Sequence, residues 1–134
     1  MKLLITAMIT TALAATAPLA HAEVAVIVAA NASVSPSQSE VANIFLGKNN
    51  SLKGIDQKGW NPTKEKFYSM LTNKSESQLK SYWSGLVFTG KGQPPQSVDD
   101  DASVVATVGS EANRIGYVDK AAVNNKVKVL FTLP

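Results

Sequence analysis

The sequence predicts an α/β protein built as a three-layer αβα sandwich around a mostly parallel sheet. Residues 23–30 (EVAVIVAA) form a near-continuous apolar run, as expected of a strand that is covered on both faces. Residues 75–87 place apolar side chains at helical spacing, so they predict an amphipathic helix. Along the chain the expected order is strand, helix, short strand, two or three helices, strand, strand.

The first helix is predicted to begin near residue 35. Ser35 is expected to be its N-cap, Pro36 its first residue and Gln38 the third member of a capping box. Gly47 is expected to end this helix, because glycine readily adopts the left-handed conformation that follows a helix. The buried face of the helix is expected to consist of Val41, Ile44 and Phe45.

The middle of the chain predicts a short strand, a turn and two further helices. Residues 55–57 fit the strand and residues 58–61 the turn, after which Pro62 opens the second helix. Ser75 and Gln78 form a capping box at the start of the third helix. The inward side chains of the second helix are expected to be Phe67, Met70 and Leu71. Those of the third are expected to be Leu79, Tyr82, Trp83, Leu86 and Val87.

The C-terminal part begins with a loop over residues 89–95, in which Lys91 is expected to be solvated, with contact to an anion or a partner as the alternative. Residues 99–101 are three aspartates that we expect to cap a fourth helix. A calcium site is the alternative, but the Asp-x-Asp-x-Asp-Gly pattern is missing. Residues 115–118 and 126–132 are expected to be the last two strands.

Residues 1–22 have the features of a cleavable export signal. Lys2 supplies the positive charge, an apolar segment follows, and Ala20 and Ala22 form a small-x-small cleavage site. Cleavage after Ala22 would leave residues 23–134 as a single domain in the periplasm. An uncleaved membrane anchor is the alternative.

Composition argues against an enzyme. The sequence has no cysteine, and its one histidine, His21, lies within the expected signal. Residues 23–134 therefore lack thiol nucleophiles, histidine-based triads and the usual zinc or haem ligands, and we expect no metal and no cofactor. The net charge of +3 is small and the basic residues are dispersed, so nucleic acid is not an expected partner.

Three strings in the expected order resemble the phosphate-binding periplasmic protein family of ABC transporters, in particular its short members from proteobacteria. They are residues 39–48 (SEVANIFLGK), 82–92 (YWSGLVFTGKG) and 115–118 (IGYV). The resemblance implies the type 2 periplasmic-binding fold. In that family two lobes hold the anion between them, and this chain has room for a single lobe.

The resemblance also implies an anion site in the loop that leads into the second helix. Thr63 matches a threonine of the family motif, and Asn61 stands in place of its serine. Pro62 replaces a glycine and Gln57 falls near an arginine position, which removes a bidentate donor. The candidate binding residues are Gln57, Lys58, Gly59, Trp60, Asn61 and Thr63. The alternative is an ordinary helix start, with Asn61 as N-cap and Trp60 covering the core.

By this resemblance the protein is a periplasmic solute-binding protein for phosphate or a related oxyanion, binding it weakly as a lone lobe. Its expected partners are an inner-membrane ABC permease or another envelope protein. A second copy could complete the cleft as a homodimer. The alternative is an interaction module of the envelope that has kept the fold and lost the anion.

Overall fold

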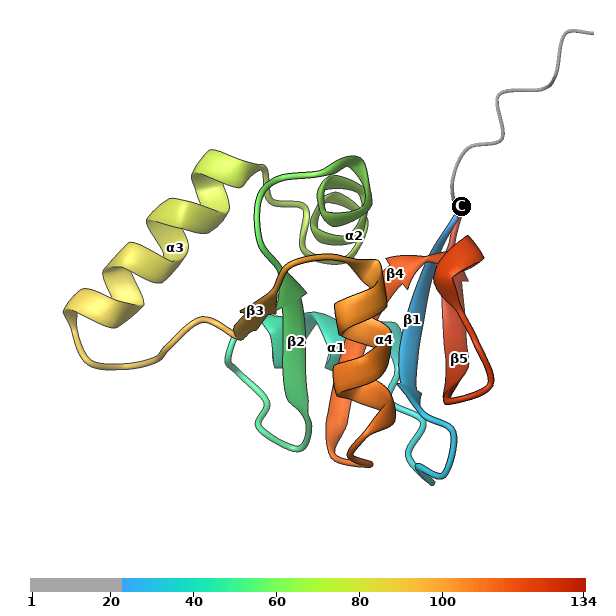
Figure 1. Cartoon of the computed structure of the whole chain (residues 1–134). Coiled ribbons are helices and arrows are strands. Elements are labelled where there is room, and N and C mark those ends of the chain that lie inside the picture. Colours follow the sequence, from blue (N-terminus) through green and yellow to red (C-terminus); the bar gives the residue numbers. More distant parts are fainter. Residues whose placement is uncertain (1–22) are drawn as a thin grey trace, which may run out of the picture.

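The computed structural model describes residues 23–134, so the predicted signal and its cleavage site lie outside the described part of the chain. Figure 1 shows a twisted sheet with helices on both faces. The strands are β1 (Val24–Ala29), β2 (Lys53–Gln57), β3 (Gln96–Val98), β4 (Arg114–Asp119) and β5 (Val127–Leu133). The helices are α1 (Gln38–Phe45), α2 (Pro62–Thr72), α3 (Glu76–Phe88), α4 (Asp101–Gly109) and the short 3₁₀ helix η1 (Lys120–Ala122).

The five strands lie in the order β3-β2-β4-β1-β5. β2 pairs in parallel with β3 and β4, whereas β1 runs antiparallel between β4 and β5. Four strands thus point one way and the first strand points the other way, so the sheet is mixed. The predicted α/β class is confirmed. The antiparallel placement of β1 was not predicted, because an apolar run does not reveal the direction of its neighbours.

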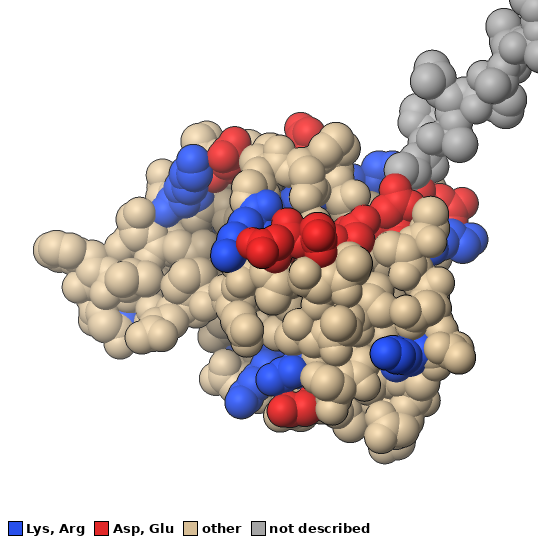
Figure 2. Space-filling model, in the orientation of Figure 1, with Lys and Arg blue, Asp and Glu red and all other residues tan. Residues whose placement is uncertain are grey.

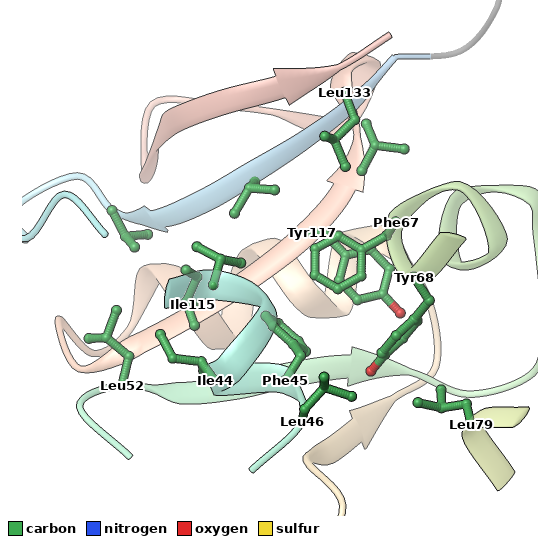
Figure 3. Packing of buried hydrophobic residues seen from close by; sticks show 14 of the residues in the cluster. Ile44, Phe45, Leu46, Leu52, Phe67, Tyr68, Leu79, Ile115, Tyr117 and Leu133 are labelled. Atoms are coloured by element: carbon green, nitrogen blue, oxygen red, sulfur yellow. The ribbon is translucent and has the colours of Figure 1, made fainter. Parts of the chain in front are cut away.

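The predicted three layers are present, because both faces of the sheet are covered. Alternate residues of β1 face opposite layers: Val24, Val26 and Val28 pack in the cluster under α1 and α2, and Ala25 and Ile27 pack under α4. Figure 3 shows the larger cluster, in which the rings of Phe67 and Tyr117 are stacked beside Phe45.

The start of α1 differs from the prediction: the N-cap is Ser37, and its capping-box partner is Glu40. The Ser37 hydroxyl accepts from the Glu40 amide at 3.2 Å, and the Glu40 carboxylate accepts from the Ser37 amide at 3.5 Å. A carboxylate near the positive helix end is stabilised more than the neutral amide of Gln38. Pro36 therefore precedes the helix, where its missing N–H breaks no helical hydrogen bond.

The other predicted caps are confirmed, at Asn61 for α2, Ser75 with Gln78 for α3 and Asp100 for α4. Two inward assignments are wrong. On α2, Met70 is 48% exposed and Tyr68 is buried instead. On α3, Val87 is 52% exposed, because the C-terminal half of α3 extends beyond the body of the protein (Figure 1). Strand β3, which follows the predicted loop 89–95, is a further element that was not predicted. Among residues 23–134, no helix has the length and apolar character that a membrane crossing requires.

Candidate functional site

The candidate site is organised around Asp56, which lies near the C-terminal end of β2 and is 5% exposed. Its carboxylate accepts hydrogen bonds from the hydroxyls of Tyr68, at 2.5 Å, and Tyr117. It also accepts from the backbone amide of Gln57 at 2.8 Å. A buried carboxylate needs such partners, since transferring an unpaired charge out of water is strongly unfavourable. The buried carboxylate of Asp56 therefore links β2 to α2 and β4.

Burial, and then the negative charge of Asp56, raise the pKa of both Tyr68 and Tyr117 above the ordinary tyrosine value. Both hydroxyls therefore keep their protons at neutral pH and act as donors. Neither tyrosine is a candidate base or nucleophile, and the pair serves to hold Asp56.

Lys64 supplies the positive charge next to Asp56. Its Nζ donates to the carbonyl of Gln57 at 2.8 Å and lies 3.6 Å from an Asp56 carboxylate oxygen. The ammonium also lies over the rings of Trp60 and Tyr68, 5.8 and 5.9 Å from their centroids. The charge of Lys64 is thus largely offset within the protein.

The side chains of Gln57 and Asn61 are engaged in internal hydrogen bonds. Gln57 is 1% exposed, and its Nε2 donates to Asp101 at 2.6 Å and to the carbonyl of Tyr117 at 3.1 Å. Its Oε1 accepts from Asn61 Nδ2 at 2.8 Å, and Asn61 Oδ1 accepts from the Lys64 amide at 2.8 Å. These two predicted binding side chains tie the end of β2 to the starts of α2 and α4.

The remaining predicted residues lie around the same helix start. Lys58 is exposed and pairs with Asp99 at 3.0 Å. Gly59 has a φ of 74°, a left-handed turn that favours glycine. Trp60 is half-buried and stacks on Tyr68 with centroids 6.1 Å apart. Thr63 is half-buried in the first turn of α2.

The first turn of α2 keeps two backbone donors. Pro62 has no N–H, and the Lys64 amide is capped by Asn61. Within residues 23–134, the amides of Asn61 and Thr63 donate to no other protein group. Free amides at a helix start, together with the helix dipole, favour a bound anion.

A groove of about 630 Å³ separates this region from α3. Asp56, Gly59, Trp60 and Lys64 line one side, and residues of α3 and of the segment 94–97 line the other. Of the predicted site residues, Gly59 and Trp60 reach the groove, whereas Gln57, Lys58, Asn61 and Thr63 do not line it.

The charge of this end of the molecule is mixed. Figure 2 shows acidic side chains in a band across the face on which α4 begins, with basic side chains beside them. No group of three or more potential metal-ligating side chains is present in the described residues. Asp56, Lys64, Tyr68 and Tyr117 were not among the predicted site residues. The signal for Asp56 was a carboxylate in the middle of the predicted short strand 55–57, directly after the apolar Ile55.

Comparison with protein-family models and with curated proteins finds no match. Comparison with solved structures does. The fold matches a protein from Clostridium perfringens described as a phosphate ABC transporter substrate-binding protein with bound phosphate, with a TM-score of 0.63 and 17% identity. It also matches an ABC-type phosphate transport receptor from Vibrio cholerae, with a TM-score of 0.61 and 13% identity.

Each match covers 81% of this chain but only 44% and 46%, respectively, of the two neighbours. The chain therefore spans less than half the length of these structures. The likeness confirms the predicted fold, which is that of a part of such a binding protein.

Proposed function

We propose that this protein is a periplasmic solute-binding protein whose ligand is phosphate or a related small oxyanion, held at the first turn of α2. The observation that carries the proposal is the pair of free amides at Asn61 and Thr63, in a fold shared with a solved protein that binds phosphate. The N-terminal end of α2 offers the anion two N–H donors and the positive end of the helix dipole.

The proposed binding is weak. Lys58 is the nearest exposed cation along the chain, but its ammonium is paired with Asp99, and the charge of Lys64 is offset by Asp56. Hydrogen bonds to a charged group contribute roughly 1.5–3 kcal/mol each. Two such bonds contribute roughly 3–6 kcal/mol in total, and the free energy of immobilising the ligand must be subtracted from this sum. The dissociation constant is therefore expected in the millimolar range or weaker.

Calorimetric titration of the purified protein with phosphate, sulfate and a dicarboxylate tests this proposal. We expect heat and a rise in melting temperature for at least one anion at about 10 mM. Lys58→Glu should weaken the effect, whereas Lys53→Glu, which makes the same charge change at the other end of β2, should not. No heat and no melting shift with any of the three anions would overturn the proposal.

A second candidate is an envelope interaction module that keeps the fold without binding an anion. Two observations favour it: the side chains of Gln57 and Asn61 are used internally, and Phe88 at the end of α3 is 92% exposed. Its partner would be an ABC permease or another envelope protein. Recovery of a stoichiometric envelope partner, together with no heat in the anion titrations, would favour the interaction module over the solute-binding protein.

A further inference from the structure

Helix α3 and the loop after it form an arm that extends from the body of the protein (Figure 1). We propose that two copies of this chain associate through these arms, with Phe88 of each copy entering the groove of the other. This inference does not rest on anion binding and holds for either candidate function.

The end of the arm is apolar and exposed. Phe88 is 92% exposed and its neighbour Val87 is 52% exposed. By contrast, the phenylalanines of α1 and α2, Phe45 and Phe67, are fully buried. Isolated exposed aliphatic residues are ordinary, but an almost fully exposed phenylalanine beside an exposed valine at the tip of a projecting helix marks an association surface.

The distal half of α3 is also free of charged side chains. Residues 81–90 contain no acidic and no basic side chain, and Lys91 is the next charged residue. Figure 2 shows mostly uncharged side chains at the far end of this arm on the visible face. The nearer half of α3 carries Glu76 and Lys80, which pair with each other at 3.1 Å. An uncharged segment of a second arm can therefore pack there without electrostatic repulsion and without burying an unpaired charge.

The groove offers a matching receptor on the same molecule. Its volume of about 630 Å³ exceeds that of a phenylalanine side chain, and its apolar lining comprises Trp60, Leu79, Trp83, Pro94 and Pro95. The charges that line it balance, with Asp56 and Glu76 against Lys64 and Lys80. Such a lining favours an uncharged apolar side chain such as that of Phe88.

A two-fold axis lets both contacts form at once, because each copy carries an exposed Phe88 and a groove. Helix α3 contributes to both of these features. Phe88 is at the C-terminal end of α3, and Leu79 and Lys80 line the groove nearer its N-terminal end. If the two arms run antiparallel, Phe88 of one copy lies opposite Leu79 of the other. The axis then passes near residues 83 and 84, midway between them.

A membrane surface is a poorer occupant of the arm. Interfacial helices combine an apolar face with several lysines or arginines that meet anionic headgroups. The distal part of this arm offers Lys91 alone among residues 81–95. The observations therefore favour a second copy, and vesicle binding becomes an outcome of the test.

Sedimentation velocity of the purified protein over the micromolar range tests the association. We expect a monomer–dimer equilibrium that Phe88→Asp weakens by at least about tenfold. Met70→Asp is the matched control, because Met70 is also exposed, at 48%, but lies on α2. A monomer at all concentrations, or a dimer that Phe88→Asp leaves intact, would overturn the proposal.

Cross-linking tests the antiparallel geometry, since the sequence has no cysteine of its own. Ser84→Cys should give covalent dimers under mild oxidation, because the two Cα atoms lie near the axis. Ser77 is also exposed and lies seven residues earlier on the same side of α3, away from the proposed axis. Ser77→Cys should therefore not give covalent dimers. Equal cross-linking of both variants would contradict this geometry. Monomeric protein that binds anionic vesicles through Phe88 would assign the arm to a membrane instead.

Discussion

The substitution Asp56→Asn should destabilise the protein far more than the loss of a carboxylate from its surface. Asp56 is 5% exposed and accepts from Tyr68, Tyr117 and the Gln57 amide, with Lys64 beside it. Asparagine has nearly the same shape, so the substitution tests hydrogen bonding and charge with little change in packing.

The expected loss follows from these contacts. An asparagine side chain keeps one acceptor oxygen and turns an NH₂ group toward one of the two tyrosine hydroxyls. One charge-assisted hydrogen bond is lost, which costs roughly 1.5–3 kcal/mol. Lys64, whose side chain is 14% exposed, loses its counter-charge as well. We expect a total of about 3–4 kcal/mol, within the range of about 3–5 kcal/mol for breaking a buried ion pair.

Urea unfolding followed by tryptophan fluorescence measures this loss. Asp99→Asn is the matched control, because Asp99 pairs with Lys58 on the surface, with side chains 77% and 64% exposed. Its removal should change the free energy of unfolding by less than about 1 kcal/mol. If Asp56→Asn also changed stability by less than about 1 kcal/mol, the proposed role of this network would be refuted.

Three further predictions concern other parts of the protein. Stability should fall above about pH 10, because Tyr68 and Tyr117 have raised pKa values in the folded state. Above this pH the unfolded chain releases protons that the folded chain keeps. The free energy of unfolding then falls by about 1.4 kcal/mol per pH unit for each tyrosine. Unfolding curves between pH 9 and 12 check this, and Tyr117→Phe should remove one of the two contributions; a flat profile would contradict the assignment. Gly116→Ala should destabilise the protein by about 1–3 kcal/mol, because a Cβ there would lie 2.7 Å from a valine methyl of α4. Gly85→Ala has open space around its Cβ and should stabilise α3 by about 0.5–1 kcal/mol. Thermal unfolding at low protein concentration compares the two variants, and equal effects would contradict this account. Mass spectrometry of the exported protein should show a chain beginning after Ala22, and an intact N-terminus would reject the cleavage prediction.

Most of the secondary structure could be predicted from local patterns. The caps at Asn61, Ser75 and Asp100 follow from residue type and spacing, because each satisfies helix amides within its own turn. Ser35 was misassigned since two serines flank one proline, and the choice between them depends on the charge of Glu40, whose carboxylate is favoured at the positive end of the helix over the neutral amide of Gln38. Strand β3 was missed because its three residues carry no apolar alternation.

The site was harder to predict, because its chemistry depends on contacts between distant segments. Gln57 was expected to bind a ligand, yet its partners Asp101 and Tyr117 lie far along the chain. The burial of Tyr68 in place of Met70 likewise depends on Asp56, which accepts a hydrogen bond from a hydroxyl at that position. Sequence patterns located the loop, but tertiary contacts decide which of its polar groups remain free.

The antiparallel position of β1 also shapes how the protein can fold. Val24, at its start, pairs with Asp119 of β4 and with Leu133 of β5, so the first strand of the domain finds its partners in the last two. Such long-range pairing slows folding, because a large loop must close before β1 can pair with either neighbour. Until β5 is available, β1 can pair only with β4, and the other edge of the apolar segment 24–29 stays open to intermolecular pairing. The sheet is therefore completed only when β5 has paired with β1. A chain truncated before residue 127 should aggregate.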